Sequence, residues 1–137
     1  MLSATELTDD LFEAQFKNGT LDPAVFDHEA HLRLAWIHIT KYGVDAAMEN
    51  ISTQLYAFVT ALGAKDKYNH TLTIAAVKAV GHFVSRSDQD NFAGFIQQFP
   101  RLKTDFKGLM RAHYGIDIFN SATAKQQWLE PDLLPFN

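Results

Sequence analysis

Two histidines stand three residues apart in the segment FDHEAHLRLAW, which runs from Phe26 to Trp36. At about 100° per residue, His28 and His31 fall on one side of a helix, and His38 continues the same side. An imidazole changes charge near neutral pH, so it can bind a metal ion, form hydrogen bonds or transfer a proton. This segment is therefore the first candidate for a functional site.

A metal centre is one hypothesis for these histidines. His28 and His31 offer two nitrogen ligands from one helical turn, and imidazole suits divalent transition metals. A catalytic zinc needs a third protein ligand and an open position, and His70 or His113 is the candidate for that ligand. The spacing itself is not diagnostic, because HEAH is one residue shorter than His-Glu-x-x-His and the chain has no Glu-x-x-His.

A second polar segment, KDKYNHTLT, runs from Lys65 to Thr73 into the start of a predicted helix. The free amides of a helix N-terminus, the charge of Lys67 and the nearby hydroxyls suit a polar or anionic ligand. A purely structural interpretation is also open, in which Asn69 or Thr71 caps the helix and Tyr68 packs on the core.

The two segments predict one site if their helix N-termini meet at the same end of a bundle. We then expect a pocket between the second and fourth helices, in which the histidines form hydrogen bonds or transfer protons. Lys67 would attract the ligand at the mouth, and hydroxyl groups would donate to it. The predicted ligand-binding residues are His28, His31, Lys67, Tyr68, Thr71 and Thr73, and the predicted metal ligands are His28, His31 and His70.

Helix signals recur along the whole chain. Ser3 and Glu6 fit a capping box, apolar residues follow at helical spacing, and Gly19 is a stop signal. Asp27 can cap the second helix, and Ser87 with Asp90 resembles the cap of a later one. The further helices are expected at 27–43, 45–63, 71–85, 87–99, 104–114 and 121–128.

These signals predict an all-α fold. No segment shows the alternation of a strand, and no linker divides the 137 residues. We expect a compact single-domain bundle, residues 1–137, of six or seven helices. Its short connections, many of which end in glycine, favour antiparallel neighbours.

Composition narrows the classes of function. A net charge of −4 lacks the basic excess of nucleic-acid binders, so no nucleic-acid partner is expected. The chain has no cysteine, which removes disulfides and thiolate metal sites. No apolar run approaches the roughly 20 residues that span a bilayer. The polar, acidic first ten residues lack a signal-peptide pattern, so we expect a cytoplasmic protein without a membrane partner.

Three motifs together resemble a family of small bacterial all-helical proteins of unknown activity. They are FDHEAHLRLAW, KYNHTLT and the ending SATAKQQWLEPDLLPF, which match the pattern FxHxxHLRxAW, KYxxTxT and PDLxP from Phe26 to Pro135. The resemblance implies that His28, His31, Lys67, Tyr68, Thr71 and Thr73 occupy the marked positions of the family. It departs at Asn69, where the family pattern has a histidine, and this weakens a metal role here.

Three functions remain open at this point. The first is a pocket for a small polar or anionic molecule, and whether it catalyses a reaction is undecided. The second is an interaction module that forms a homo-oligomer without any chemistry. The third is a mononuclear metal enzyme, a hydrolase, whose metal is bound by the same histidines. For the second function, the residues expected to be partly exposed are Phe92, Phe95, Phe99 and Trp128.

Overall fold

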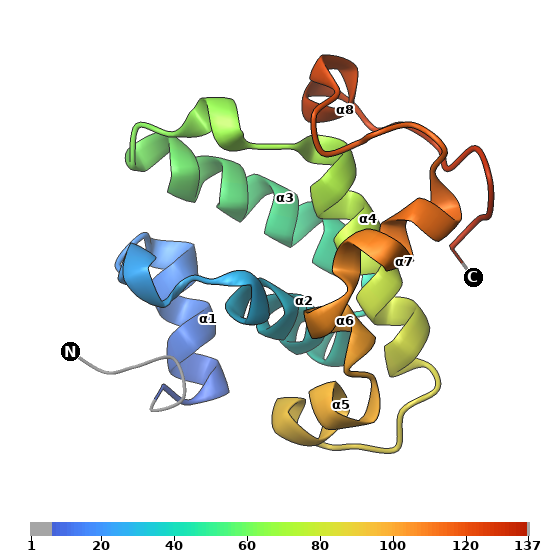
Figure 1. Ribbon diagram of the computed structural model, residues 1–137. Coiled ribbons are helices and arrows are strands. Elements are labelled where there is room, and N and C mark those ends of the chain that lie inside the picture. The colour runs from blue at the N-terminus through green and yellow to red at the C-terminus, as the bar shows by residue number, and fades with distance from the viewer. Residues whose placement is uncertain (1–6, 137) are drawn as a thin grey trace.

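Helices account for all the regular structure that the computed structural model describes, which covers residues 7–136. This confirms the all-α prediction. The bundle has eight α-helices and two 3-10 turns in this range (Figure 1). The helices are α1 (Asp9–Asn18), α2 (His28–Tyr42), α3 (Val44–Ala61), α4 (His70–Val84), α5 (Phe92–Gln98), α6 (Arg101–Thr104), α7 (Phe106–His113) and α8 (Ala122–Gln126). The 3-10 turns are η1 (Pro23–Val25) and η2 (Lys65–Lys67).

Several predicted helix ends are confirmed because their signals are local. The Asp27 carboxylate accepts a hydrogen bond from the Ala30 amide at 2.8 Å and starts α2. Gly19 ends α1 with a φ of 74°, a left-handed conformation that favours glycine. The Ser121 hydroxyl accepts from the amide of Ala124 and caps α8.

Other predicted ends are wrong or shifted. The capping box of Ser3 and Glu6 lies outside the described residues, and Thr8 is the N-cap of α1. Asn91, rather than Ser87, caps α5 by accepting from the amide of Gly94. The helix expected at 104–114 is shifted and begins at Phe106 as α7, because Asp105 ends the single turn of α6 and caps α7.

The centre of the fold is formed by α2, α3 and α4, which pack against one another pairwise. Helix α2 is the most deeply placed, and its segment from Leu34 to Ile39 is entirely buried. At the far end of the group, a Cβ on Gly81 of α4 would lie 2.8 Å from the Val44 side chain of α3. Glycine therefore permits the close approach of these two helices.

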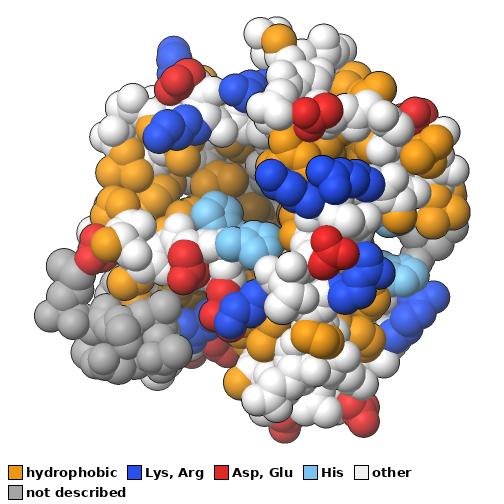
Figure 2. All heavy atoms as spheres, in the orientation of Figure 1, with side chains coloured by type: hydrophobic (Ala, Val, Ile, Leu, Met, Phe, Trp, Pro, Cys, Tyr) orange, Lys and Arg blue, Asp and Glu red, His pale blue; other side chains and the backbone are white. Residues whose placement is uncertain are grey.

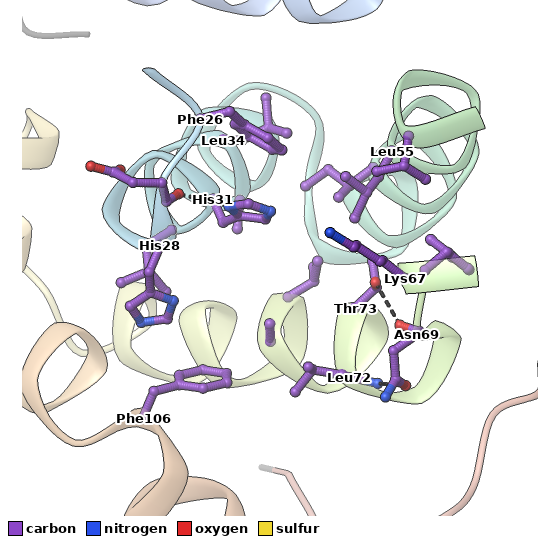
Figure 3. Close-up of a pocket in the computed structure, with 18 of the residues that line it drawn as sticks. Phe26, His28, His31, Leu34, Leu55, Lys67, Asn69, Leu72, Thr73 and Phe106 are labelled. Carbon is purple, nitrogen blue, oxygen red and sulfur yellow. Dashed lines mark hydrogen bonds between the residues drawn. The ribbon is translucent and has the colours of Figure 1, made fainter. Parts of the chain in front are cut away.

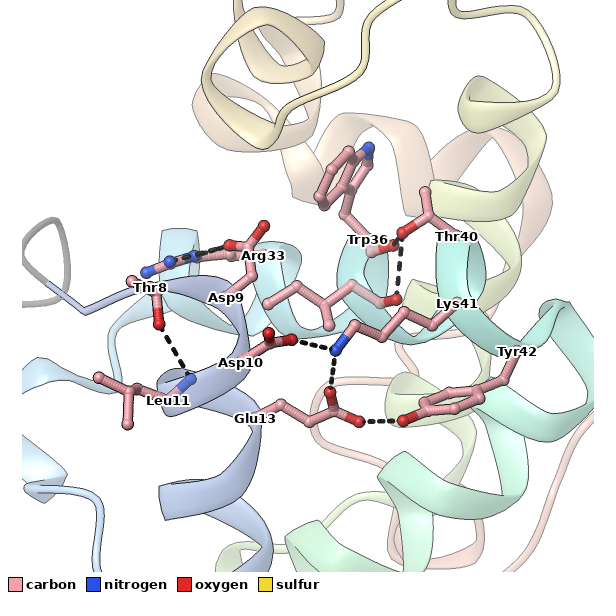
Figure 4. A network of polar contacts seen from close by, with 11 residues as sticks. Thr8, Asp9, Asp10, Leu11, Glu13, Arg33, Trp36, Thr40, Lys41 and Tyr42 are labelled. Carbon is pink, nitrogen blue, oxygen red and sulfur yellow. Dashed lines mark hydrogen bonds and ion pairs between the residues drawn. The ribbon is translucent and has the colours of Figure 1, made fainter.

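Polar contacts hold α1 against α2 (Figure 4). Arg33 of α2 donates to the Asp9 carboxylate at 2.9 Å and to the carbonyl of Leu7 at 2.7 Å. In the last turn of α2, Lys41 pairs with Asp10 and with Glu13. The arginine of the first sequence motif therefore has a structural role.

A buried polar turn joins the C-terminal part of the chain to α4. The Asn69 side chain caps α4 by accepting from the Leu72 amide, and its amide group donates to the carbonyl of Ile118 at 2.7 Å. The Thr71 hydroxyl donates to the carbonyl of Gln127 at 2.6 Å and accepts from the amide of Leu129 at 3.0 Å. These bonds place α8 and the following residues beside α4 (Figure 1).

His38 is the least satisfied polar residue of the core. It is 1% exposed, and neither ring nitrogen has a hydrogen-bond partner among residues 7–136. Burial lowers its pKa below the ordinary 6.5, because the charged form loses hydration. The nearby carboxylate of Glu13 opposes this effect, and the ammonium of Lys41 adds to it. His38 is therefore a neutral imidazole held in the core.

No helix in the described range combines the length and the apolar character needed to cross a bilayer.

The substitution His38→Leu tests the cost of this buried imidazole. We expect the free energy of unfolding at neutral pH to rise by about 1 kcal/mol, because a buried polar group without a partner is removed. The unfolded chain binds a proton near pH 6.5 while folded His38 does not, so wild-type stability falls as pH decreases below 6.5. Urea unfolding at pH 7.5 and 5.5 measures both effects.

In His38→Leu, the loss of stability between pH 7.5 and pH 5.5 should be smaller than in the wild type. It should not vanish, because the pKa values of His31 and His82 are also lowered. A variant that is less stable than wild type, with the same loss between the two pH values, would contradict the assignment.

Candidate functional site

A cavity of about 450 Å³ opens between α2, α3 and α4. In the space-filling view, histidine side chains stand at the edge of a hollow with hydrophobic side chains behind them (Figure 2). The close-up shows residues of α2 facing residues of η2 and α4 across the cavity (Figure 3). The volume lies in the range of small-molecule sites, which is about 300–1,000 Å³.

The floor of the cavity is apolar. Its side chains come from the three central helices and from Phe26, just before α2. Two aromatic residues from later in the chain complete the wall. These side chains are Phe26, Leu32, Leu34, Ala35, Ile51, Leu55, Val59, Leu72, Ala76, Val77, Phe106 and Phe119. Burying an apolar ligand here would be favourable by roughly 25 cal/mol per Å² of apolar surface removed from water.

His28 lies at the rim and is fixed by its surroundings. Its Nε2 is 3.0 Å from the carbonyl oxygen of Leu102, and its ring packs edge-on against Phe106 at 5.2 Å. A carbonyl oxygen only accepts, so Nε2 must carry the hydrogen. Nδ1 is then left for another partner.

His31 is fixed in the same manner through its other nitrogen. Nδ1 lies 2.7 Å from the carbonyl oxygen of Asp27, so Nδ1 carries the hydrogen, and the ring stacks on Phe26 at 3.8 Å. The side chain is exposed to the cavity but densely surrounded by protein, and this partial burial lowers its pKa. The Asp27 carbonyl opposes the shift, and the proximity of His28 adds to it.

Lys67 is the cation of the cavity lining. It is the last residue of η2, on the opposite side of the cavity from α2, and its ammonium end points toward His31 (Figure 3). No hydrogen bond or ion pair joins this ammonium to another residue in the range 7–136. Asp27 supplies a carboxylate to the lining, but its charge already interacts with the first turn of α2 through the Ala30 amide.

The structure divides the residues of the second motif between two roles. Tyr68 and Thr73 line the cavity together with Lys67, as expected. Burial raises the pKa of Tyr68, so its hydroxyl stays protonated. Thr71 does not reach the cavity, because it is fully buried and bonded to the C-terminal segment. His70 also lies outside the lining, and its Nδ1 is hydrogen-bonded to the Tyr68 hydroxyl at 2.9 Å.

The proposed metal ligands do not form a centre. Among the described residues, no group of three or more histidine, cysteine, aspartate or glutamate side chains is placed to hold a metal ion. His113, the alternative third ligand, bonds instead to the carbonyl of Leu134 at 2.7 Å and stacks on Phe136. Within residues 7–136 the geometry therefore lacks the third ligand that the metal hypothesis requires.

Sequence reasoning missed the apolar part of the site. Ile51, Leu55 and Val59 recur at helical spacing along α3, but this spacing does not indicate that they border an open volume. Phe106 and Phe119 come from parts of the chain far from both motifs. Helical periodicity identifies an inward face, and it carries no signal for a gap within the packing.

The aromatic residues expected at an interaction surface are only partly available. Phe95 is fully buried, while Phe92, Phe99 and Trp128 are half-buried against the core. The large apolar side chains that are most exposed, Leu133 and Leu134, lie in the C-terminal segment instead.

Comparisons with family models, with curated proteins and with solved structures give no match for this chain. The family resemblance of the three motifs therefore stays a prediction.

Thr71→Val should separate the structural role of the second motif from a binding role. It leaves the Leu129 amide and the Gln127 carbonyl without their partner, so we expect a loss of about 1–3 kcal/mol of stability. Thr73→Val is the matched control, because the Thr73 hydroxyl bonds locally, to the Asn69 carbonyl at the start of its own helix and to Tyr68. It should cost less than about 1 kcal/mol.

Urea unfolding gives both values, and hydrogen exchange should show faster exchange of the Leu129 amide in Thr71→Val alone. Equal losses in the two variants, with unchanged exchange at Leu129, would contradict this role for Thr71.

Proposed function

We propose that the chain is a small-molecule binding protein, and that its cavity takes a ligand with an apolar body and an anionic or hydrogen-bonding end. The observation that carries the proposal is the distribution of groups in the lining. The floor is apolar, whereas His28 and His31 on one side of the cavity face Lys67 on the other.

Two further observations support this ligand class. The Lys67 ammonium has no partner in the described range, although a lysine beside acidic residues commonly forms an ion pair, as Lys41 does. The imidazoles of His28 and His31 are each oriented by a backbone carbonyl, so one nitrogen of each ring remains for a ligand. A group with fixed orientation loses little entropy when it binds.

The apolar body of the ligand refines the expectation from the sequence. A small, wholly polar molecule would leave the aliphatic floor in contact with water and would gain nothing from it. An amphipathic molecule uses both parts of the lining, because its apolar body removes the floor from water while its polar end remains at the rim.

Anilinonaphthalene sulfonate is a suitable first probe, since it joins an apolar ring system to a permanent negative charge. We expect saturable binding to the folded protein, with a rise in probe fluorescence. Ala76→Phe fills the floor of the cavity and should abolish this binding. Ala93→Phe, at an exposed position of α5, is the control and should bind the probe as wild type does. Absence of saturable binding, or equal binding by both variants, would refute the proposal.

Lys67→Met tests the anionic end separately. The affinity for the probe should fall about two- to five-fold, the value of a solvent-exposed ion pair. Lys65→Met is matched in chemistry and lies on the same turn but outside the lining, so it should change the affinity little. Salt at about 0.5 M should weaken probe binding by the wild type and should change probe binding by Lys67→Met little. Equal effects of the two lysine variants would assign the attraction to overall charge instead.

A further inference from the structure

The acceptor character of His31 narrows the ligand class. Its Nδ1 donates to the Asp27 carbonyl, and burial holds its pKa below the ordinary value. At neutral pH the ring is therefore uncharged, and Nε2 carries a lone pair and no hydrogen. The ring lines the cavity and faces the end of Lys67 (Figure 3). A ligand that fills the cavity without giving Nε2 a donor would bury an unsatisfied acceptor.

Lys67 places the opposite requirement on the same region of the ligand. Its ammonium offers hydrogen-bond donors and a positive charge, and has no acceptor. The polar end of the ligand must then combine a negative charge for Lys67 with a neighbouring hydrogen-bond donor for His31. The two requirements come from different elements, α2 and η2, that face each other across the cavity.

We infer that the cavity recognises a hydroxycarboxylic acid with an apolar chain, whose carboxylate pairs with Lys67 and whose hydroxyl donates to Nε2 of His31. This inference rests on the proposed function and specifies the substrate class of the same site. A simple fatty acid satisfies Lys67 and leaves Nε2 without a donor. A simple alcohol satisfies Nε2 and leaves the ammonium without an anion.

An amino acid with an apolar side chain fits less well. Its ammonium group would satisfy Nε2, but it would also place a second positive charge near Lys67. Like charges brought together at a binding site are costly, and they are a common means of rejecting the wrong ligand. A hydroxyl provides the donor without the charge.

The direct test compares octanoate, β-hydroxyoctanoate and octanol, titrated into the wild-type protein and followed by calorimetry or by amide chemical shifts. The hydroxy acid should bind about three- to ten-fold more tightly than octanoate, the value of one neutral hydrogen bond. Octanol should bind more weakly than the hydroxy acid. Equal affinities of the two acids would overturn the inference.

His31→Leu isolates the effect of the Nε2 acceptor, because it replaces the imidazole with an apolar side chain of similar size. The preference for the hydroxy acid over octanoate should disappear in this variant. His113→Leu is the matched control, since His113 lies outside the lining and should leave the preference intact. A preference that persists in His31→Leu would assign the hydroxyl to another residue and overturn the inference.

Acidification provides a second readout of the same nitrogen. Below the pKa of His31, Nε2 gains a proton and becomes a donor with a positive charge. Binding of octanoate should then strengthen relative to the hydroxy acid, so the preference should shrink as pH falls. A preference independent of pH would overturn the role of Nε2.

The outcomes separate this inference from the proposed function. If anilinonaphthalene sulfonate binds and Ala76→Phe abolishes its binding, the cavity is a ligand site, even when the two acids bind equally. If neither the probe nor any of the three octyl compounds binds, both the proposed function and the inference fail.

Discussion

The first turn of α4 is the constraint on which the rest of the structure depends. Asn69 and Thr71 are buried polar side chains, and each uses its hydrogen-bonding groups in two directions. Asn69 accepts from the amide of Leu72 and donates to the carbonyl of Ile118, in the loop that carries Phe119. Thr71 donates to the carbonyl of Gln127 and accepts from the amide of Leu129. Because a buried polar group without a partner is costly, these bonds specify one position for the C-terminal segment. This turn therefore helps to place Phe119, one of the two later aromatic residues of the cavity wall.

Helix α2 holds three histidines in two different hydrogen-bonding situations. His28 and His31 each have a backbone carbonyl that fixes the hydrogen on one nitrogen. His38 has no hydrogen-bond partner in the described range and is enclosed by the core. The difference follows from position, because the first two lie near the N-terminus of α2, where the bundle is open, and the third lies where α1 and α3 cover the helix. Residue type alone does not determine which of the three can meet a ligand.

Local signals explain how much of this fold is predictable from sequence. Asp27, Gly19 and Ser121 act within a few residues of their own positions, so the caps and stops they form could be assigned in advance. The role of Thr71 could not, because its partners lie 56 and 58 residues further along the chain. Its neighbours in sequence suggested a ligand-binding hydroxyl. In the folded chain, the Thr71 hydroxyl instead donates to the Gln127 carbonyl and accepts from the Leu129 amide.

The candidate site follows the same division. Histidine spacing and the start of α4 led to the prediction that His28, His31 and Lys67 lie near two helix N-termini, and all three line the cavity. The apolar floor could not be predicted from the sequence, because an apolar residue that lines a cavity follows the same pattern as one that fills a core. The prediction of a small polar ligand reflects this, as it was drawn from the polar residues alone. An open apolar volume behind them changes the expected ligand from polar to amphipathic.

The structural roles of the motif residues also indicate which atoms remain for function. Arg33, Asn69 and Thr71 are engaged by α1 or by the C-terminal segment, and one nitrogen of each rim histidine is engaged by a carbonyl. Within residues 7–136, the cavity groups that keep an unpartnered nitrogen are the imidazoles of His28 and His31 and the ammonium of Lys67. Two of these three atoms have defined and opposite character, an acceptor on His31 and a charged donor on Lys67. The ligand that we propose therefore carries a donor and an anion at its polar end, and its hydrocarbon part suits the apolar floor.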